Sequence, residues 1–348
     1  MYRLLIRPLL FLLTPESVHA LLVRILRISL HIPGLRWVLY KVYHVRNKAL
    51  ETEFLGMTFS NPVGLAAGFD KNAEIYREFH PFGFSFIEVG TVTPLAQPGN
   101  PRPRSFRIRA DRGLINRMGF NNHGAAAAAA KLGGKRPKGL IIGGNIGKNT
   151  QTPNEDAVAD YEAVFRAIYD GVDYFVVNVS CPNITDLHKL QDQDSLEAIL
   201  GRILEIRKMM DPMKPVLLKI SPDLNDQQLD ETLEIIDKLK IDGIVATNTT
   251  IRRDGLKTPP ETLKAIGSGG MSGAPITRRS LEVVRYIHEK THGNLPIIAV
   301  GGIMSEQDGL NMLEAGATLI QLYTGFIYEG PALAKRINKA ILRKIQAG

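Results

Sequence analysis

The sequence predicts an α/β fold, a (β/α)8 TIM barrel preceded by a small amphipathic helical segment at the N-terminus. From residue 61 onward, short apolar runs rich in β-formers alternate with helical patterns eight times. The 348 residues suit one barrel with a short appendage, because single barrels commonly exceed about 250 residues. An open doubly wound sheet would favour a glycine-rich nucleotide-binding motif after the first strand, and the sequence has no such motif there. We therefore expect an N-terminal segment of residues 1–48 and a barrel domain of residues 49–348.

Eight apolar runs are expected to form the barrel strands. They cover residues 62–68, 84–93, 139–147, 174–180, 216–221, 243–249, 296–302 and 318–324. Each is followed by a stretch of helical periodicity, and these stretches cover residues 73–79, 122–132, 156–169, 195–210, 226–239, 277–292, 305–315 and 331–345. Residues 267–273 loosely resemble a nucleotide-binding glycine motif, but they follow a helical segment, so we expect a flexible loop there.

Charge and cysteine content exclude several classes of protein. Residues 1–48 carry eight basic side chains and one acidic side chain, a balance of +7, so the other 300 residues contribute only +1 to the net charge of +8. A basic patch confined to one end is typical of docking on an anionic surface, and the near-neutral body offers no groove for nucleic acid. The single cysteine, Cys181, rules out an intramolecular disulfide framework and a cysteine-based zinc site, and a reducing compartment is the default.

The N-terminal segment is predicted to neither cross a membrane nor be cleaved. Arg7 and Glu16 bracket only eight uncharged residues, far fewer than a bilayer span requires. Thr14 and Pro15 begin a helix that should run to about residue 30. Its polar face (Ser17, Arg24, Arg27, His31) lies opposite an apolar face (Val18, Leu22, Ile25, Leu26, Leu30). The apolar face either packs on the barrel or lies in a membrane interface, and the apolar stretch 4–13 favours the membrane.

Barrel enzymes place their chemistry at the carboxyl ends of the strands, and these ends are polar or glycine-rich here. They are residues 67–71, Thr91, Asn145, Asn178, Lys219, residues 247–249, Gly301 with Gly302, and residues 323–325. Singly, an asparagine there is usually a cap and a lysine an ion-pair partner. Together they suit a planar heterocycle with carbonyl and imide edges. The glycines offer backbone N–H groups to a phosphate, although tight turns are their ordinary role. Without an acidic pair or a histidine cluster, glycosidase and metal-dependent hydrolase functions are disfavoured, and no metal is expected.

These residues belong to motifs that run through the whole chain. The motifs are GLAAGFDK (64–71), NPRPR (100–104), NRMGFNN (116–122), NIGK (145–148), NVSCPN (178–183), ATNTT (246–250), GMSG (270–273), VGGI (300–303) and YTG (323–325). In order and spacing the sequence resembles the membrane-associated, quinone-linked class of dihydroorotate dehydrogenases. The resemblance implies oxidation of dihydroorotate to orotate in pyrimidine biosynthesis, with one FMN per chain and reoxidation by a membrane quinone. It also implies a peripheral protein on the cytoplasmic face of a bacterial cell membrane, and it allows a monomer.

The resemblance also assigns site residues. FMN would be bound by Ala67, Gly68, Phe69, Asp70, Lys71, Thr91, Asn145, Asn178, Lys219, Thr247, Gly273, Gly302, Tyr323 and Thr324, among which Lys219 would stabilise the charge of the reduced flavin. Dihydroorotate would be contacted by Lys71, Asn116, Arg117, Met118, Gly119, Phe120, Asn178, Asn183, Asn248 and Thr249. His19 and Arg107 match positions of the quinone tunnel, although a histidine among apolar positions is more often a core residue with a satisfied hydrogen bond.

One position departs from the class. Cys181 stands where this class usually has a serine base, as in the soluble class, and Ile184 stands where a threonine of a proton relay is usual. A serine hydroxyl is a very poor base that plausibly needs a relay, whereas a thiol with an ordinary pKa of about 8.5 supplies some thiolate itself. We therefore expect Cys181 to take the proton, the alternative being an inert buried thiol.

Three other functions stay open at this stage. A soluble fumarate-linked or NAD-linked dihydroorotate dehydrogenase is favoured by Cys181 and opposed by the basic N-terminal helix. A dihydrouridine synthase, another FMN barrel that uses a cysteine, is opposed by the near-neutral barrel. A catalytically silent FMN-binding membrane protein is opposed by the complete ring of polar strand ends.

Overall fold

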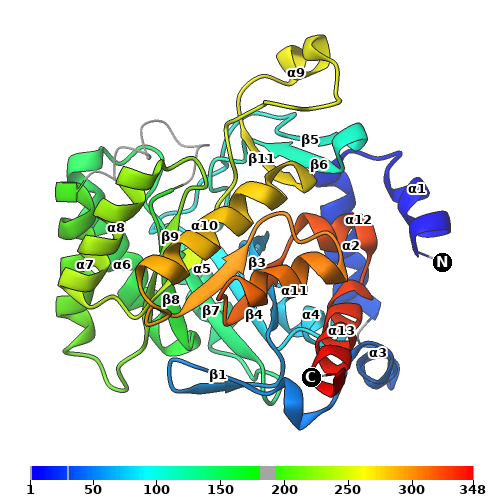
Figure 1. Ribbon diagram of the computed structural model, residues 1–348, viewed down its shortest axis with the longest axis horizontal. Coiled ribbons are helices and arrows are strands. Elements are labelled where there is room, and N and C mark those ends of the chain that lie inside the picture. Colours follow the sequence, from blue (N-terminus) through cyan, green and yellow to red (C-terminus); the bar gives the residue numbers. More distant parts are fainter. Residues whose placement is uncertain (1, 30, 181–192, 348) are drawn as a thin grey trace.

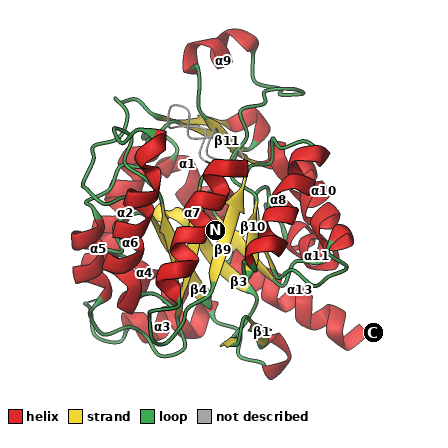
Figure 2. Cartoon of the chain, turned by 90° about the vertical axis from the view of Figure 1, so that its left-hand side faces the viewer, coloured by secondary structure: helices red, strands yellow, loops and turns green. Residues whose placement is uncertain are grey.

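The computed structural model describes residues 2–29, 31–180 and 193–347, and its centre is a closed barrel of eight parallel strands (Figures 1 and 2). Around the barrel the order is β10 (Gly243–Ala246), β12 (Ile297–Val300), β13 (Leu319–Leu322), β3 (Val63–Asp70), β4 (Phe86–Val92), β7 (Ile141–Ile146), β8 (Tyr174–Asn178) and β9 (Val216–Ile220). All eight predicted strands are present, so the predicted fold class is confirmed.

Helices surround the barrel (Figure 2). They are α4 (Tyr76–Phe79), α5 (Ala125–Leu132), α6 (Ala157–Ile168), α7 (Gln193–Arg207), α8 (Asp226–Leu239), α10 (Thr277–Lys290), α11 (Glu306–Glu314) and α13 (Leu333–Ala347). Side-chain caps begin two of them: Asn225 and Gln228 form a reciprocal capping box at α8, and Ser305 caps α11. The first helix is shorter than predicted because the Asp70 carboxylate accepts the amides of Glu74 and Ile75, which makes a turn before α4.

Two small sheets were not predicted. A hairpin of β1 (Thr52–Phe54) and β2 (Met57–Phe59) lies at the amino-terminal end of the barrel, and β5 (Ser105–Ile108), β6 (Gly113–Asn116) and β11 (Gly270–Gly273) form an antiparallel sheet at the opposite end (Figure 1). The expectation of a flexible loop at residues 267–273 was therefore wrong. Strand β11 pairs with β6, more than 150 residues earlier, and no local pattern signals such a pairing.

The core has an inner and an outer part. Strand side chains that point outward pack against the helices, and those that point inward fill the lower barrel. The inner cluster is Phe54, Phe59, Ala66, Phe86, Tyr174, Val176, Leu217, Val245, Ile298, Val300 and Leu319. Gly64 and Gly143 make room for it, since a Cβ on either would lie within 2.4 Å of the rings of Phe86 and Tyr174 respectively. The amino-terminal end is thus closed, and open space remains at the other end.

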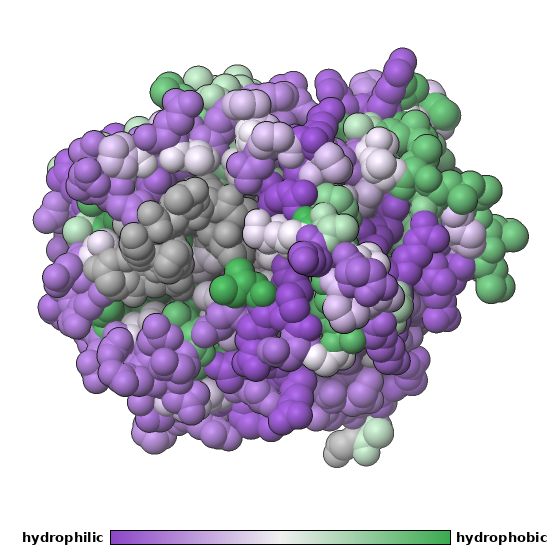
Figure 3. Space-filling model, turned by 90° about the horizontal axis from the view of Figure 1, so that it is seen from above, coloured by the Kyte–Doolittle hydropathy of each residue, from purple (hydrophilic) through white to green (hydrophobic). Residues whose placement is uncertain are grey.

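The N-terminal segment forms η1 (Tyr2–Ile6), α1 (Arg7–Leu10), α2 (Pro15–Ser29) and α3 (Leu35–Tyr43) along one side of the barrel (Figure 1). Thirteen of the eighteen large apolar side chains that are most exposed lie in residues 2–42, and Figure 3 shows apolar surface gathered on this side. Within the described residues, no single helix is long and apolar enough to span a membrane. The residues Tyr2–Leu10 and Pro15–Ser29 satisfy length and composition only as a pair bent by 112°.

Candidate active site

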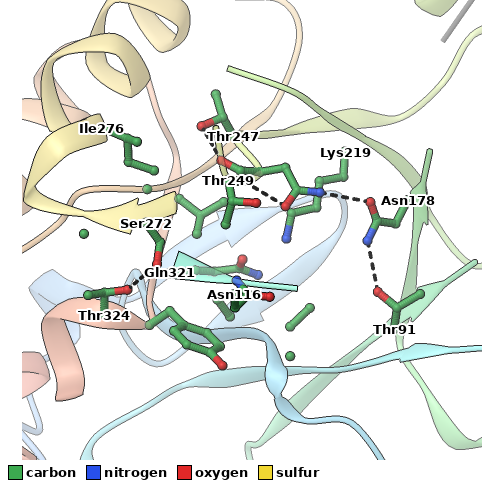
Figure 4. A pocket seen from close by; sticks show the side chains of 18 of the residues that line it. Thr91, Asn116, Asn178, Lys219, Thr247, Thr249, Ser272, Ile276, Gln321 and Thr324 are labelled. Carbon is green, nitrogen blue, oxygen red and sulfur yellow. Dashed lines mark hydrogen bonds between the residues drawn. The ribbon is translucent and has the colours of Figure 1, made fainter. Parts of the chain in front are cut away.

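A polar cavity lies at the carboxyl-terminal end of the barrel, below the sheet formed by β5, β6 and β11 (Figure 4). It encloses about 990 Å³, including the part that is open to solvent. Among the predicted residues, its wall contains Ala67, Gly68, Lys71, Thr91, Asn116, Met118, Gly119, Phe120, Asn178, Lys219, Thr247, Asn248, Thr249, Gly273, Gly302, Tyr323 and Thr324. Residues spread over 258 positions of the sequence therefore meet in one site, as the reading of strand ends predicted.

Amide and hydroxyl groups form a connected row along one wall of the cavity. Asn178 Nδ2 donates to Thr91 Oγ1 at 3.0 Å, and Asn248 Nδ2 donates to Asn178 Oδ1 at 3.2 Å (Figure 4). Asn248 Nδ2 also donates to Ser180 Oγ at 3.0 Å. These groups are held at the ends of β4, β8 and β10, so their spacing is set by the barrel itself. Such a row can bind the carbonyl and N–H edges of a planar ring.

Lys219 brings a positive charge to the cavity. It lies at the end of β9, in register with Asn178 of β8, and is only 6% exposed. Its ammonium group lies 3.9 Å from Oε1 of Glu88, beyond hydrogen-bonding distance. A buried ammonium with so loose a partner favours a negatively charged or electron-rich group in the adjoining space.

At the other end of the cavity the wall is bare backbone. A Cβ on Gly302 would lie 2.3 Å from Thr277 Cα, and one on Gly325 would lie 2.0 Å from the carbonyl oxygen of Ile303. No larger residue fits at either position, so the cavity wall here is glycine backbone, whose N–H groups carry no side chain beside them. The hydroxyls of Ser272 and Thr324, 2.8 Å apart, lie beside them (Figure 4). This end has the donors that a phosphate group requires.

Lys71 lies at the end of β3. Its Nζ donates to the carbonyl of Gly68 at 2.9 Å. Burial, assisted by the positive charge of Arg104, lowers the pKa of Lys71 to about 8, while Glu16 and Asp70 oppose the shift. A substrate carboxylate beside Lys71 would raise this pKa and stabilise the charged form of the ammonium group.

Four predicted residues do not line the cavity, and each has a structural position instead. Phe69 points to the opposite side, where its carbonyl binds His19, and Asp70 caps the turn before α4. Asn145 is fully buried beneath Thr91 and Asn178. The guanidinium of Arg117 donates to the carbonyls of Ile266 and Ser268 and holds the segment that follows α9 (Pro260–Ile266). Cys181, Asn183 and Ile184 lie outside the described residues.

Several residues of this site were not predicted from the sequence. Ala66, Ser272, Ile276, Val300, Ile303 and Gln321 also line the cavity. Glu88, just beneath it, is a fully buried acidic residue in the middle of a strand. A charged residue inside an apolar run was the one available signal, because buried charges require partners. Ser272 was hidden by the incorrect reading of residues 267–273 as a loop.

A second, largely apolar cavity of about 1450 Å³, including its open part, lies between the N-terminal segment and the barrel. Helix α2 contributes Val18, Leu22 and Leu26, and both predicted tunnel residues, His19 and Arg107, line this cavity. His19 Nε2 lies 2.7 Å from the Phe69 carbonyl, and burial lowers the pKa of His19, so the neutral ring donates this hydrogen bond. His19 is thus a satisfied histidine that also faces the cavity.

The two cavities share one wall. Lys71, Asn116, Met118, Ser272 and Tyr323 line both of them. The polar cavity and the apolar cavity are therefore separated by a single layer of side chains.

Ion pairs attach the N-terminal segment to the barrel. Arg104, which is 5% exposed, binds Glu16 of α2 at 2.7 Å, and Arg102 binds it at 3.0 Å. Arg107 donates to the Leu13 carbonyl at 2.6 Å. At the other end of the segment, the Tyr2 hydroxyl donates to the carbonyl of Ile327 at 2.6 Å. The apolar cavity therefore has a defined wall on the side of the N-terminal segment.

Comparisons with known proteins show which family the chain belongs to. The family model described as dihydroorotate dehydrogenase matches residues 49–345. A relative from Christiangramia forsetii, named dihydroorotate dehydrogenase (quinone), is 52% identical over 344 residues, 99% of each chain. A relative of the same name from Rhodococcus erythropolis is 47% identical and covers 100% of this chain and 96% of its own. A crystal structure of DHODH from Eimeria tenella in complex with ferulenol has a TM-score of 0.84 at 32% identity, covering 96% of this chain and 92% of that one. The chain belongs to the dihydroorotate dehydrogenase family.

Proposed function

We propose that this chain oxidises dihydroorotate to orotate with FMN as its cofactor and passes the electrons to a membrane quinone. The observation that carries the proposal is the shared wall, which places a polar cavity directly against an apolar one. A water-soluble, anionic substrate suits the first cavity, and an apolar acceptor suits the second. Residues 49–348 would form the catalytic barrel, and residues 1–48 would form the tunnel wall and the membrane-docking surface.

The polar cavity has the groups that FMN requires. Three groups suit the polar edge of the flavin ring: the buried, loosely paired ammonium of Lys219, the side-chain amide of Asn178 and the hydroxyl of Thr91. The bare backbone at Gly302, with the Ser272 and Thr324 hydroxyls beside it, suits the phosphate. When bound, FMN accepts a hydride from the substrate and later returns the electrons to the acceptor.

The chain's own residues would bind the substrate and take its proton. Lys71 would pair with the carboxylate of dihydroorotate, and Asn116 and Asn248 would bind the amide edges of its ring. We propose that Cys181, as a thiolate, removes the proton from the carbon next to the one that loses hydride. A positioned base of this kind contributes roughly a hundredfold to ten-thousandfold in rate.

The N-terminal segment would place the apolar cavity at a lipid surface. Its exposed apolar side chains, such as Leu12 (78% exposed) and Ile28 (63% exposed), lie in the same segment as seven excess positive charges. Apolar burial and attraction to anionic lipids together favour peripheral binding. We propose that this occurs at the cytoplasmic face of a bacterial cell membrane, from which quinone would enter.

The proposal predicts that the purified protein is yellow and releases FMN when it is denatured. Dihydroorotate added without air should bleach the flavin absorbance, and a quinone should restore it. The measurement is an anaerobic spectral titration, followed by turnover with quinones, fumarate and NAD as acceptors. A colourless protein that cannot be reconstituted with FMN would contradict the proposed cofactor, and preference for fumarate or NAD would favour the soluble type of the same activity.

The low pKa of Lys71 predicts that orotate binding weakens at alkaline pH. Its cationic form, which binds the carboxylate, is present below about pH 8 and is lost as the pH rises through that value. The dissociation constant of orotate should therefore rise above pH 8, approaching about tenfold per pH unit. At pH 7, Lys71→Met should weaken binding by about 10-fold to 100-fold and remove this pH dependence. Flavin absorbance changes measure both.

The control is Lys138→Met, which removes an exposed lysine just before β7, at the opposite end of the barrel. It should bind orotate as the parent does. Equal affinities for the parent and Lys71→Met between pH 6 and 9 would show that another group binds the carboxylate.

A further inference from the structure

Glu88 is a fully buried acidic residue beneath the candidate active site. It lies on β4, points into the barrel and has an exposed fraction of 0%. Its Oε1 accepts a hydrogen bond from Asn145 Nδ2 at 2.7 Å, and its Oε2 accepts one from Gln321 Nε2 at 2.5 Å. Lys219 Nζ lies 3.9 Å from Oε1. Both oxygens thus accept N–H groups, which lowers the cost of burying a carboxylate.

A row of hydrogen bonds runs upward from Glu88 to the cavity. Asn145 Oδ1 accepts from Thr91 Oγ1 at 2.5 Å, and Thr91 Oγ1 accepts from Asn178 Nδ2 at 3.0 Å. Asn178 Oδ1 then accepts from Asn248 Nδ2 at 3.2 Å. In each of these bonds the donor is on the side of Asn248 and the acceptor is on the side of Glu88. All four bonds of the row therefore have the same direction.

The chemistry of the last group fixes this direction. A carboxamide has a donor end and an acceptor end of nearly equal size, and either end can occupy either position. A carboxylate can only accept. Asn145 must therefore turn Nδ2 toward Glu88 and Oδ1 toward Thr91, and the same constraint passes to Asn178. If the side chain at position 88 could donate as well as accept, Asn145 could turn its Oδ1 toward position 88. Every hydrogen bond of the row could then run in the opposite direction.

We propose that Glu88 is a positioning residue that fixes the donor and acceptor pattern of the candidate active site before a ligand binds. The ligand class is a planar heterocycle with amide-type edges, which reads this pattern through Thr91, Asn178 and Asn248. Glu88 also offsets the charge of Lys219 on the same wall. The inference deepens the proposed FMN site and rests on it.

Two isosteric variants separate these effects. Glu88→Gln removes the charge and lets the end of the row donate as well as accept, whereas Asn145→Leu interrupts the row at a residue that does not line the cavity and leaves the charge of Glu88 in place. Both should weaken FMN binding by the apoprotein by about tenfold or more, measured by quenching of flavin fluorescence. Only Glu88→Gln should raise the reduction potential of bound FMN, because Lys219 then stabilises the reduced form more strongly. Glu53→Gln, at an exposed carboxylate of β1, is the matched control.

The double variant tests the row as a unit. If Glu88 acts through Asn145, the double variant should bind FMN no more weakly than Glu88→Gln alone, since interacting residues are not additive. Additive losses would overturn the inference, as would Glu88→Gln with the parental affinity and potential. Should Glu88→Gln not fold, Asn145→Leu decides, and an unchanged FMN affinity in that variant would overturn the inference. A parent protein that does not bind FMN contradicts the proposed function instead.

Discussion

Replacing Cys181 with alanine is expected to slow flavin reduction by dihydroorotate by about a hundredfold to ten-thousandfold while FMN stays bound. That range is the usual contribution of a positioned general base. In the parent protein the rate at saturating substrate should rise with pH through the pKa of the thiol, about 8.5 if unperturbed. Anaerobic stopped-flow measurements between pH 6 and 10 would record both. Saturating substrate is needed because the affinity changes with pH through Lys71.

The single thiol of the chain makes the controls clean. Alkylation should label one site, abolish flavin reduction and be prevented by orotate. Cys181→Ser should be slow because residue 184 is isoleucine, and adding Ile184→Thr should partly restore the rate by supplying a hydroxyl for a relay. Flavin reduction at the parental rate in Cys181→Ala, over the whole pH range, would assign the proton to another group.

Deleting residues 1–48 is expected to lower quinone reduction by roughly a hundredfold and to leave flavin reduction by dihydroorotate nearly unchanged. The deletion removes one wall of the apolar cavity, including Val18, Leu22 and Leu26. Losing about 3 kcal/mol of apolar contact with a quinone corresponds to that factor. The truncated protein should also no longer bind anionic vesicles. Salt alone should release the full chain only in part, because apolar burial is not screened.

Two substitutions in α2 separate the tunnel from the membrane surface. Leu22 lines the apolar cavity, whereas Ile28 is 63% exposed and does not line it. In detergent, Leu22→Glu should impair quinone reduction and Ile28→Glu should not, whereas Ile28→Glu should weaken vesicle binding. Normal quinone reduction by the truncated protein would show that the acceptor uses another route.

Regular alternation of strands and helices predicted the barrel, because each unit buries an apolar face that is visible in the local sequence. Strand β11 was out of reach because it consists of glycine, methionine and serine, and its partner β6 lies far away in the chain. The sequence also could not predict that the two cavities share lining residues, because these residues lie far apart in the chain. Only the folded chain brings Lys71 and Ser272 into one wall.

Side-chain direction explains why some of the predicted residues do not line the cavity. Neighbouring residues of an extended segment point to opposite sides. Asn116 and Met118 face the polar cavity, so Arg117 between them faces away and binds backbone carbonyls instead. Phe69, next to Gly68, is displaced from the polar cavity in the same way. Asn145 was correctly placed at a strand end, but sequence does not reveal that it supports Asn178 from below rather than facing the cavity.

Because a wall separates the two cavities, the proposed reductant, dihydroorotate, and the proposed oxidant, a quinone, can each bind in its own environment, one polar and one apolar. The five residues of this wall are a barrier to molecules but a short distance for an electron. The water-soluble metabolite would thus be selected by the barrel alone, and the lipid-soluble carrier by the barrel together with the first 26 residues, which contribute 11 of the 25 residues that line the apolar cavity. Changes in the helices that cover the tunnel can therefore adapt the enzyme to the carrier of a different membrane, without altering how the pyrimidine precursor is recognised.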